Sequence, residues 1–155
     1  MNSFSNKVTQ FLDSRGVRYR LVIHSKPVFT VEEAAKERGI IKNEMVKSIV
    51  VSDGKDCFLA CVPGDKRLDL DKLRNYLRSG RLSLLRAPDV LKVTGYEVGA
   101  VTPLLLKNPL RIVFDLDLRS KMNLSVSTGS HNAGLILSSS DLIGLVNPEF
   151  AMISC

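Results

Sequence analysis

One lysine interrupts an otherwise apolar stretch of the chain. The stretch is Met45-Val46-Lys47-Ser48-Ile49-Val50-Val51, and its β-branched residues predict a buried strand. A buried ammonium is costly unless it is paired or meets an anion. Lys47 therefore has two interpretations. Either its stem lies on apolar surface with the charged head in water, or it is a cation at the end of a central strand that binds a phosphate or carboxylate.

Two glycine-containing loops are the next feature that could do chemistry. One contains Gly99 within the segment Thr94-Gly95-Tyr96-Glu97-Val98-Gly99-Ala100-Val101-Thr102-Pro103, and the other contains Gly129 within Ser127-Thr128-Gly129. Glycine lets backbone N–H groups approach a ligand closely, and paired N–H donors can hold an anion or a developing oxyanion. Two tight turns explain the same glycines, and the pattern leaves both explanations open.

Histidine catalysis would have to use one of only two histidines, His24 and His131. His131 lies in a polar loop, shortly after Ser127, Thr128 and Ser130. A Ser-His-Asp triad needs a hydroxyl held against the histidine, and nothing in the sequence indicates one. His131 is then a loop residue that either contacts substrate or water or is simply solvated, and His24 is a strand-end residue. The GxSxG, P-loop, GxGxxG and HExxH motifs are missing.

The three cysteines predict neither a disulfide nor a metal site. Cys57 and Cys61 lie four apart in a predicted strand and so face one side, and we expect buried free thiols. The ligands of a structural zinc site are lacking, and no metal or other cofactor is expected.

The net charge of +6 permits an anionic partner. Basic residues gather at Lys66, Arg67, Lys72, Arg74, Arg78, Arg81 and Arg86. They are either the solvated face of a helix or a surface that follows a phosphate backbone. With 6 Phe, 3 Tyr and no Trp, an extended stacking platform for single-stranded nucleic acid is not expected.

The 155 residues predict one domain, residues 1–155. No apolar run approaches the roughly 20 residues of a membrane helix, and the first seven residues lack the apolar core of a signal peptide. A cytoplasmic location without a membrane partner is the default expectation.

Periodicity and capping residues predict short helices and strands in alternation. Helices are expected over residues 3–15, from Thr30 to Gly39, from Asp69 to near Gly80, from Pro88 to Gly95 and from Ser140 to Leu145. Strands are expected over residues 17–23, 46–51, 57–62, 82–85, 110–115, 124–127, 135–137 and 151–153, with a hairpin at Asp53-Gly54. These elements predict a mixed α/β domain whose single curved, mostly antiparallel, barrel-like sheet is flanked by short α-helices.

An ordered set of motifs carries a family resemblance. In chain order they are Thr30-Val31-Glu32-Glu33-Ala34-Ala35, Val46-Lys47-Ser48-Ile49-Val50-Val51, Val62-Pro63-Gly64-Asp65-Lys66-Arg67-Leu68-Asp69, the Thr94-to-Pro103 loop, Val113-Phe114-Asp115 and Val126-Ser127-Thr128-Gly129. From about residue 5 to 153 the chain resembles the YbaK family, which is similar to the editing domain inserted in bacterial prolyl-tRNA synthetase. The lysine within its strand and the TGYxxG…P loop are the most specific parts.

The resemblance implies a freestanding deacylase of mischarged aminoacyl-tRNA, typically cysteinyl- or alanyl-tRNA for proline. The family lysine falls on Lys47, and its implied role is to anchor the terminal adenosine and phosphate. The family's GG pair falls on Gly99 and Ala100, a departure that keeps the backbone N–H but adds a methyl. Its Ser-Gly-Gly-like loop falls on Ser127, Thr128 and Gly129, where Thr128 replaces a common glycine.

The implied substrate contacts are Phe29, Thr30, Arg67, Pro103, His131 and Asn132. The implied partner is the acceptor end of aminoacyl-tRNA, with an aminoacyl-tRNA synthetase as a second candidate. An aminoacyl ester is already activated, so a positioned water, which the tRNA 2′-hydroxyl helps to orient, and oxyanion donors can carry its hydrolysis. A small pocket would act as the second sieve. The alternatives are a non-catalytic module that binds aminoacyl-tRNA and a nucleotide- or phosphate-binding regulator.

Overall fold

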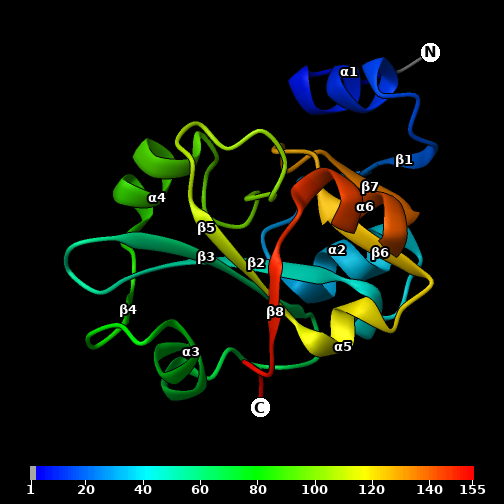
Figure 1. Ribbon diagram of the computed structural model, residues 1–155. Coiled ribbons are helices and arrows are strands. Elements are labelled where there is room, and N and C mark those ends of the chain that lie inside the picture. The colour runs from blue at the N-terminus through cyan, green and yellow to red at the C-terminus, as the bar shows by residue number, and fades with distance from the viewer. Residues whose placement is uncertain (1–2) are drawn as a thin grey trace.

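The strand that contains Lys47 is part of a hairpin at the centre of the larger of two sheets (Figure 1). The computed structural model describes residues 3–155; Met1 and Asn2, which begin the stretch without signal-peptide character, lie outside the described residues. Strand β2 (Val46–Ser52) pairs antiparallel with β3 (Cys57–Pro63). The predicted Asp53-Gly54 turn joins the two strands, and Gly54 has a φ of 92°, which favours glycine.

The larger sheet has the strand order β4-β2-β3-β5-β8. Strand β4 (Ser83–Leu84) is antiparallel to β2, whereas β5 (Arg111–Asp115) is parallel to β3 and β8 (Glu149–Ala151) is parallel to β5. The smaller sheet has the order β1-β7-β6, with β1 (Tyr19–Ile23), β7 (Ala133–Ser138) and β6 (Asn123–Ser127) paired antiparallel. An isolated parallel bridge links Met45 to Ser125 of β6.

The predicted mixed α/β class is therefore confirmed, but the prediction of a single sheet is wrong. The strands divide into two sheets, no closed barrel forms from residues 3–155, and the barrel-like form is not confirmed. The error arises because local alternation identifies strands without identifying their partners, which lie far apart in the chain.

Short helices cover the sheets. They are α1 (Lys7–Ser14), α2 (Val31–Arg38), α3 (Leu70–Leu77), α4 (Ala87–Thr94), α5 (Leu116–Arg119) and α6 (Ser139–Val146), with a 3₁₀ turn, η1, at Lys42–Glu44. The predicted caps of α2 and α3 are confirmed, because Thr30 accepts the N–H of Glu33 and Asp69 accepts those of Asp71 and Lys72.

Several predicted boundaries were wrong. Helix α1, capped by Asn6, begins at Lys7, four residues later than expected, and Ser138 rather than Ser140 caps α6. Helix α3 ends before Arg78, which takes the left-handed conformation at φ 55°. Helix α5 was not predicted, β1 begins at Tyr19 rather than 17, and the last strand ends at Ala151.

The two faces of β2 belong to two different cores. Val46 and Val50 pack in the cluster shared with α1, β6 and β7, whereas Val51 packs in the cluster shared with α3. In Figure 1, α3 and α4 lie on opposite sides of the β2–β3 hairpin. Because side chains alternate along a strand, Ser48 faces the first core and Lys47 faces the second.

The cysteines are free thiols in the part of the chain that the structure describes. Cys57 is half-buried and Cys61 fully buried, and both pack with the same core, as predicted. Cys155 is exposed, so the expectation of burial does not extend to it. None of the helices within residues 3–155 has the length and apolar character that a membrane crossing requires.

Candidate active site

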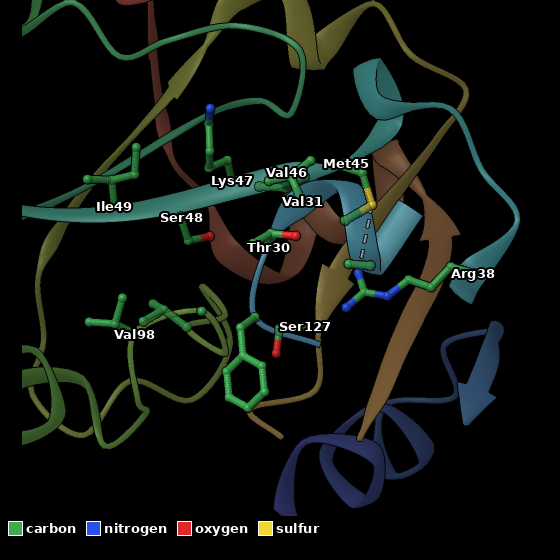
Figure 2. A pocket seen from close by; sticks show the side chains of 14 residues that line it. Thr30, Val31, Arg38, Met45, Val46, Lys47, Ser48, Ile49, Val98 and Ser127 are labelled. Atoms are coloured by element: carbon green, nitrogen blue, oxygen red, sulfur yellow. Dashed lines mark hydrogen bonds between the residues drawn. The ribbon is translucent and has the colours of Figure 1, made fainter. Parts of the chain in front are cut away.

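A cavity of about 240 Å³ lies where α2, the start of β2, the Gly99 loop and the end of β6 meet. Five of the predicted site residues line it: Phe29, Thr30, Lys47, Gly99 and Ser127. Nine residues that the sequence reasoning missed complete the wall: Val31, Ala34, Arg38, Met45, Val46, Ser48, Ile49, Val98 and Val101. Figure 2 shows Thr30, Ser48, Ser127 and Val98 around the space. The cavity is thus mainly apolar with a few polar groups, as small-molecule sites usually are.

Gly99 brings its backbone to the cavity wall. Its φ of 90° favours glycine, and a Cβ there would lie 3.3 Å from the carbonyl oxygen of Phe29 and 3.4 Å from Cε1 of His131. Within residues 3–155 the Gly99 N–H has no hydrogen-bond partner. The neighbouring Ala100 N–H donates to the Glu97 carbonyl at 2.9 Å, and Ala100 is buried. Gly99, and not Ala100, therefore offers a free backbone donor.

The Ser127 hydroxyl ties the two glycine loops together. It donates to the Ala100 carbonyl at 2.9 Å and accepts the Gly129 N–H at 2.9 Å. No histidine contacts this hydroxyl among the described residues, and its proton is donated to a backbone carbonyl, so it is not arranged as a histidine-activated nucleophile. The Gly129 N–H is already satisfied, and its contribution is to hold the loop rather than to face the cavity.

Thr128 and Gly129 lie behind the cavity wall. Thr128 is fully buried, and its hydroxyl donates to the Ala133 carbonyl at 2.8 Å. Gly129 has a φ of 91°, and a Cβ there would lie 2.5 Å from a ring carbon of Tyr96. The loop is therefore packed against the Tyr96 ring, and only Ser127 of the three predicted residues reaches the cavity.

His131 braces the cavity from outside. Its ring lies 4.6 Å from that of Phe29, and its Nδ1 lies 2.9 Å from the Val28 carbonyl, to which it donates because a carbonyl oxygen only accepts. Its Nε2 lies 3.7 Å from a carboxylate oxygen of the exposed Glu97. His131 thereby orients Phe29 at the mouth. Asn132 is exposed and does not line the cavity.

Lys47 lies at the rim with its ammonium turned away from the glycine loops. Figure 2 shows its side chain on the side of β2 opposite to Ser48 and Ser127. The ammonium donates to the Lys66 carbonyl at 2.6 Å. Burial lowers the pKa of Lys47, and the charge of Glu32 partly opposes that shift. The lysine is thus a held, partly desolvated cation beside the cavity.

Arg67 and Pro103 do not line the cavity. Arg67 is exposed near the Lys47 ammonium, whose pKa its charge helps to lower, and Pro103 is buried in the loop that follows Gly99. The basic residues from Lys72 to Arg86 are exposed, which fits both interpretations given above. Among residues 3–155 no group of three or more His, Cys, Asp or Glu could hold a metal ion.

Arg38 is the site residue that the sequence reasoning missed most clearly. It is only 5% exposed, and burial lowers its pKa to about 10. Its Nε donates to His24 Nε2 at 3.2 Å and its Nη1 donates to the Ser125 hydroxyl at 3.0 Å. Since guanidinium only donates, His24 is neutral with its proton on Nδ1, which donates to the His131 carbonyl at 2.9 Å. A signal for this was present in the sequence: Arg38 follows Ala34 by one helical turn, so the two residues share the same face of the predicted helix.

Comparison with known proteins identifies the class to which this fold and cavity belong. Residues 25–145 match the family model described as the aminoacyl-tRNA editing domain, and the chain belongs to that family. A solved structure described as a proposed trans-editing enzyme for prolyl-tRNA synthetase is similar, with a TM-score of 0.87, 26% identity and 99% coverage of each chain. The resemblance inferred from the motifs is thereby confirmed.

Two named relatives illustrate the similarity. The prolyl-tRNA editing protein ProX of Acetoanaerobium sticklandii is 28% identical over 141 residues, which cover 87% of this chain and 85% of that protein. The proline–tRNA ligase of Desulforamulus reducens is 34% identical over 107 residues, which cover 69% of this chain. The match spans only 19% of the length of that ligase.

Proposed function

We propose that this chain is a trans-acting deacylase that hydrolyses the ester of mischarged aminoacyl-tRNA. The observation that carries the proposal is the cavity beside the unpaired Gly99 N–H in a chain of the editing-domain family. The name of the ProX relative makes tRNA for proline the first candidate. Cysteine or alanine is the amino acid that the family resemblance implies for it. A cavity of about 240 Å³ has room for the aminoacyl group of such a substrate, and the side chains that line it would select which amino acid fits, as a second sieve does.

Hydrolysis in this site would depend on positioning rather than on a nucleophilic side chain. The Gly99 N–H is the donor for the ester carbonyl oxygen, on which negative charge develops when water attacks. Ser127 keeps the Gly99 loop in place through its bond to the Ala100 carbonyl. Because the ester is already activated, an oriented water is sufficient, and the tRNA 2′-hydroxyl would help to orient it.

The rim of the cavity would hold the terminal nucleotide. Lys47 supplies a cation for its phosphate, with the exposed Arg67 nearby. Phe29 is 62% exposed and offers a flat ring for the adenine, which is a common mode of base binding. Exposed basic residues on and near α3 would attract the rest of the acceptor arm.

A non-catalytic binding module is the second candidate, and two contacts favour it. The Ala100 and Gly129 N–H groups are both occupied, which leaves one backbone donor rather than a pair. The Lys47 ammonium is bonded to the Lys66 carbonyl and would have to leave it to reach a phosphate.

Release of amino acid from a panel of misacylated tRNAs separates the two candidates. A deacylase releases cysteine, alanine or another amino acid at micromolar enzyme, whereas a binding module releases none. Lys47→Ala is expected to lose nearly all activity while remaining folded. Lys55→Ala, at an exposed lysine in the hairpin turn, is the matched control and should keep full activity. A fully active Lys47→Ala variant would remove Lys47 from the site.

A further inference from the structure

The cavity wall includes a buried guanidinium whose charge no carboxylate of the described residues balances. Arg38 lines the cavity and is 5% exposed. Within residues 3–155 it forms no ion pair with Asp or Glu at 4.0 Å or less. With a pKa lowered by burial only to about 10, Arg38 remains protonated at neutral pH. A buried charge without a partner is costly, so an acceptor in the cavity would be bound favourably.

The hydrogen-bond donors of Arg38 are only partly used. Nε donates to His24, and Nη1 donates to the Ser125 hydroxyl and lies 3.9 Å from the Met45 sulfur. Nη2 has no partner among the described residues. Two N–H groups of a preorganised fork are therefore available. Figure 2 shows the guanidinium pointing toward the space between Thr30 and Ser127.

The position of the guanidinium is set by its neighbours. A Cβ on Gly134 would lie 1.9 Å from Nε of Arg38, so the side chain crosses β7 directly above a glycine. The hydrogen bond from Nε to His24 keeps the guanidinium from rotating, because the His24 ring is itself held by its bond to the His131 carbonyl. A fixed donor discriminates between ligands, because it stays without a hydrogen bond when the bound ligand has no acceptor and it cannot rotate to find another.

We propose that Arg38 makes its part of the cavity wall a subsite for a short amino acid side chain that ends in an oxygen acceptor. The preferred aminoacyl group is then a hydroxyl-bearing one, such as serine or threonine, rather than cysteine or alanine. The inference rests on the proposed function and changes its preferred amino acid. The chemical reason is that a methyl accepts no hydrogen bond and a thiol sulfur accepts only weakly, so either group would displace water from the guanidinium without fully replacing its hydrogen bonds.

Binding of stable substrate analogues tests the subsite without requiring catalysis. The probes are adenosines that carry the amino acid through a 3′-amide, compared in the near-isosteric pairs serine/cysteine and threonine/valine by titration calorimetry. In at least one pair the oxygen-bearing member is expected to bind about tenfold more tightly or better. Equal binding within both pairs overturns the inference.

Variants link the preference to Arg38. Arg38→Met should remove the tenfold preference, while Arg18→Met, at an exposed arginine, should keep it. A preference that survives in folded Arg38→Met overturns the assignment, and the wild-type comparison stands by itself if that variant does not fold.

The release assay distinguishes this inference from the proposed function. Preference for the serine analogue without hydrolysis of any ester supports the subsite and refutes the deacylase. Hydrolysis of cysteinyl and alanyl esters with equal binding within both pairs refutes the subsite and supports the deacylase.

Discussion

Gly134 lies directly beneath the Arg38 side chain, and its replacement by alanine tests the placement of the guanidinium. The new Cβ would lie 1.9 Å from Nε, 2.2 Å from Cζ and 2.7 Å from Cδ of Arg38. No real structure tolerates such contacts, so the end of the arginine must move. Movement breaks its bonds to His24 at 3.2 Å and to the Ser125 hydroxyl at 3.0 Å.

The expected cost follows from those two bonds. A hydrogen bond to a charged group contributes about 1.5–3 kcal/mol, so losing both costs about 3–6 kcal/mol. Replacing glycine by alanine within a strand returns about 0.5–1 kcal/mol through the unfolded state. Part of the loss is recovered because the flexible arginine end finds water in the cavity. After these two offsets to the two-bond estimate, we expect Gly134→Ala to lower the free energy of unfolding by about 2–4 kcal/mol relative to the wild type.

Urea unfolding followed by circular dichroism measures this change. With a slope of about 2 kcal/mol per molar urea, the midpoint should fall by about 1–2 M. Gly144→Ala in α6 is the control, because a Cβ there meets nothing within 4 Å; it should be neutral or slightly stabilising. In an Arg38→Met background the cost of Gly134→Ala should fall below about 1 kcal/mol. A Gly134→Ala midpoint equal to that of the control would refute the described position of Arg38.

Three further outcomes are expected. Gly129→Ala should destabilise the fold by about 2–4 kcal/mol, because the residue combines φ 91° with a Cβ 2.5 Å from the Tyr96 ring; an unchanged thermal midpoint would contradict that packing. Burial lowers the pKa of His24, so the free energy of unfolding should fall as the pH drops below about 6.5. His24→Gln should flatten this pH dependence between pH 7.5 and 5.5, and an equally steep dependence in the variant would assign the titration to another group. Cys155 is exposed, whereas burial raises the pKa of Cys61 to about 12. Cys155→Ser should therefore remove the fastest phase of thiol labelling by Ellman's reagent, and a fast phase that persists would place the reactive thiol at another cysteine.

Local chemistry decided which segments became helices and strands. Thr30 and Asp69 accept backbone N–H groups within three residues, and Gly95 ends α4 in the left-handed conformation. Each of these signals acts between residues that are close in the chain, so the sequence is sufficient to predict them. Where two nearby residues competed for one role, as with Ser138 and Ser140, the prediction was off by two positions.

The motifs of the sequence also determined the family. The lysine within its strand and the TGYxxG…P loop led to the editing domains, and the family match over residues 25–145 confirms this. Phe29, Thr30, Lys47, Gly99 and Ser127 do gather at one cavity. Their individual roles in catalysis and binding remain predictions that the assays above test.

Only the tertiary structure decided which donors in this cavity are free. The Gly129 N–H is used by Ser127 and the Ala100 N–H by Glu97, whereas Gly99 and the Nη2 of Arg38 have no partner among the described residues. It also directed the Lys47 ammonium away from the glycine loops.

The physical reason is that these arrangements depend on contacts between distant segments. Arg38 meets Ser125 across 87 residues, and the strands that carry Lys47 and Ser127 belong to different sheets. The sequence by itself determined most of the helices and strands, the family and the lysine in its strand. The pairing of those elements decided that Arg38, which no motif indicated and which has no Asp or Glu partner among the described residues, lines the cavity.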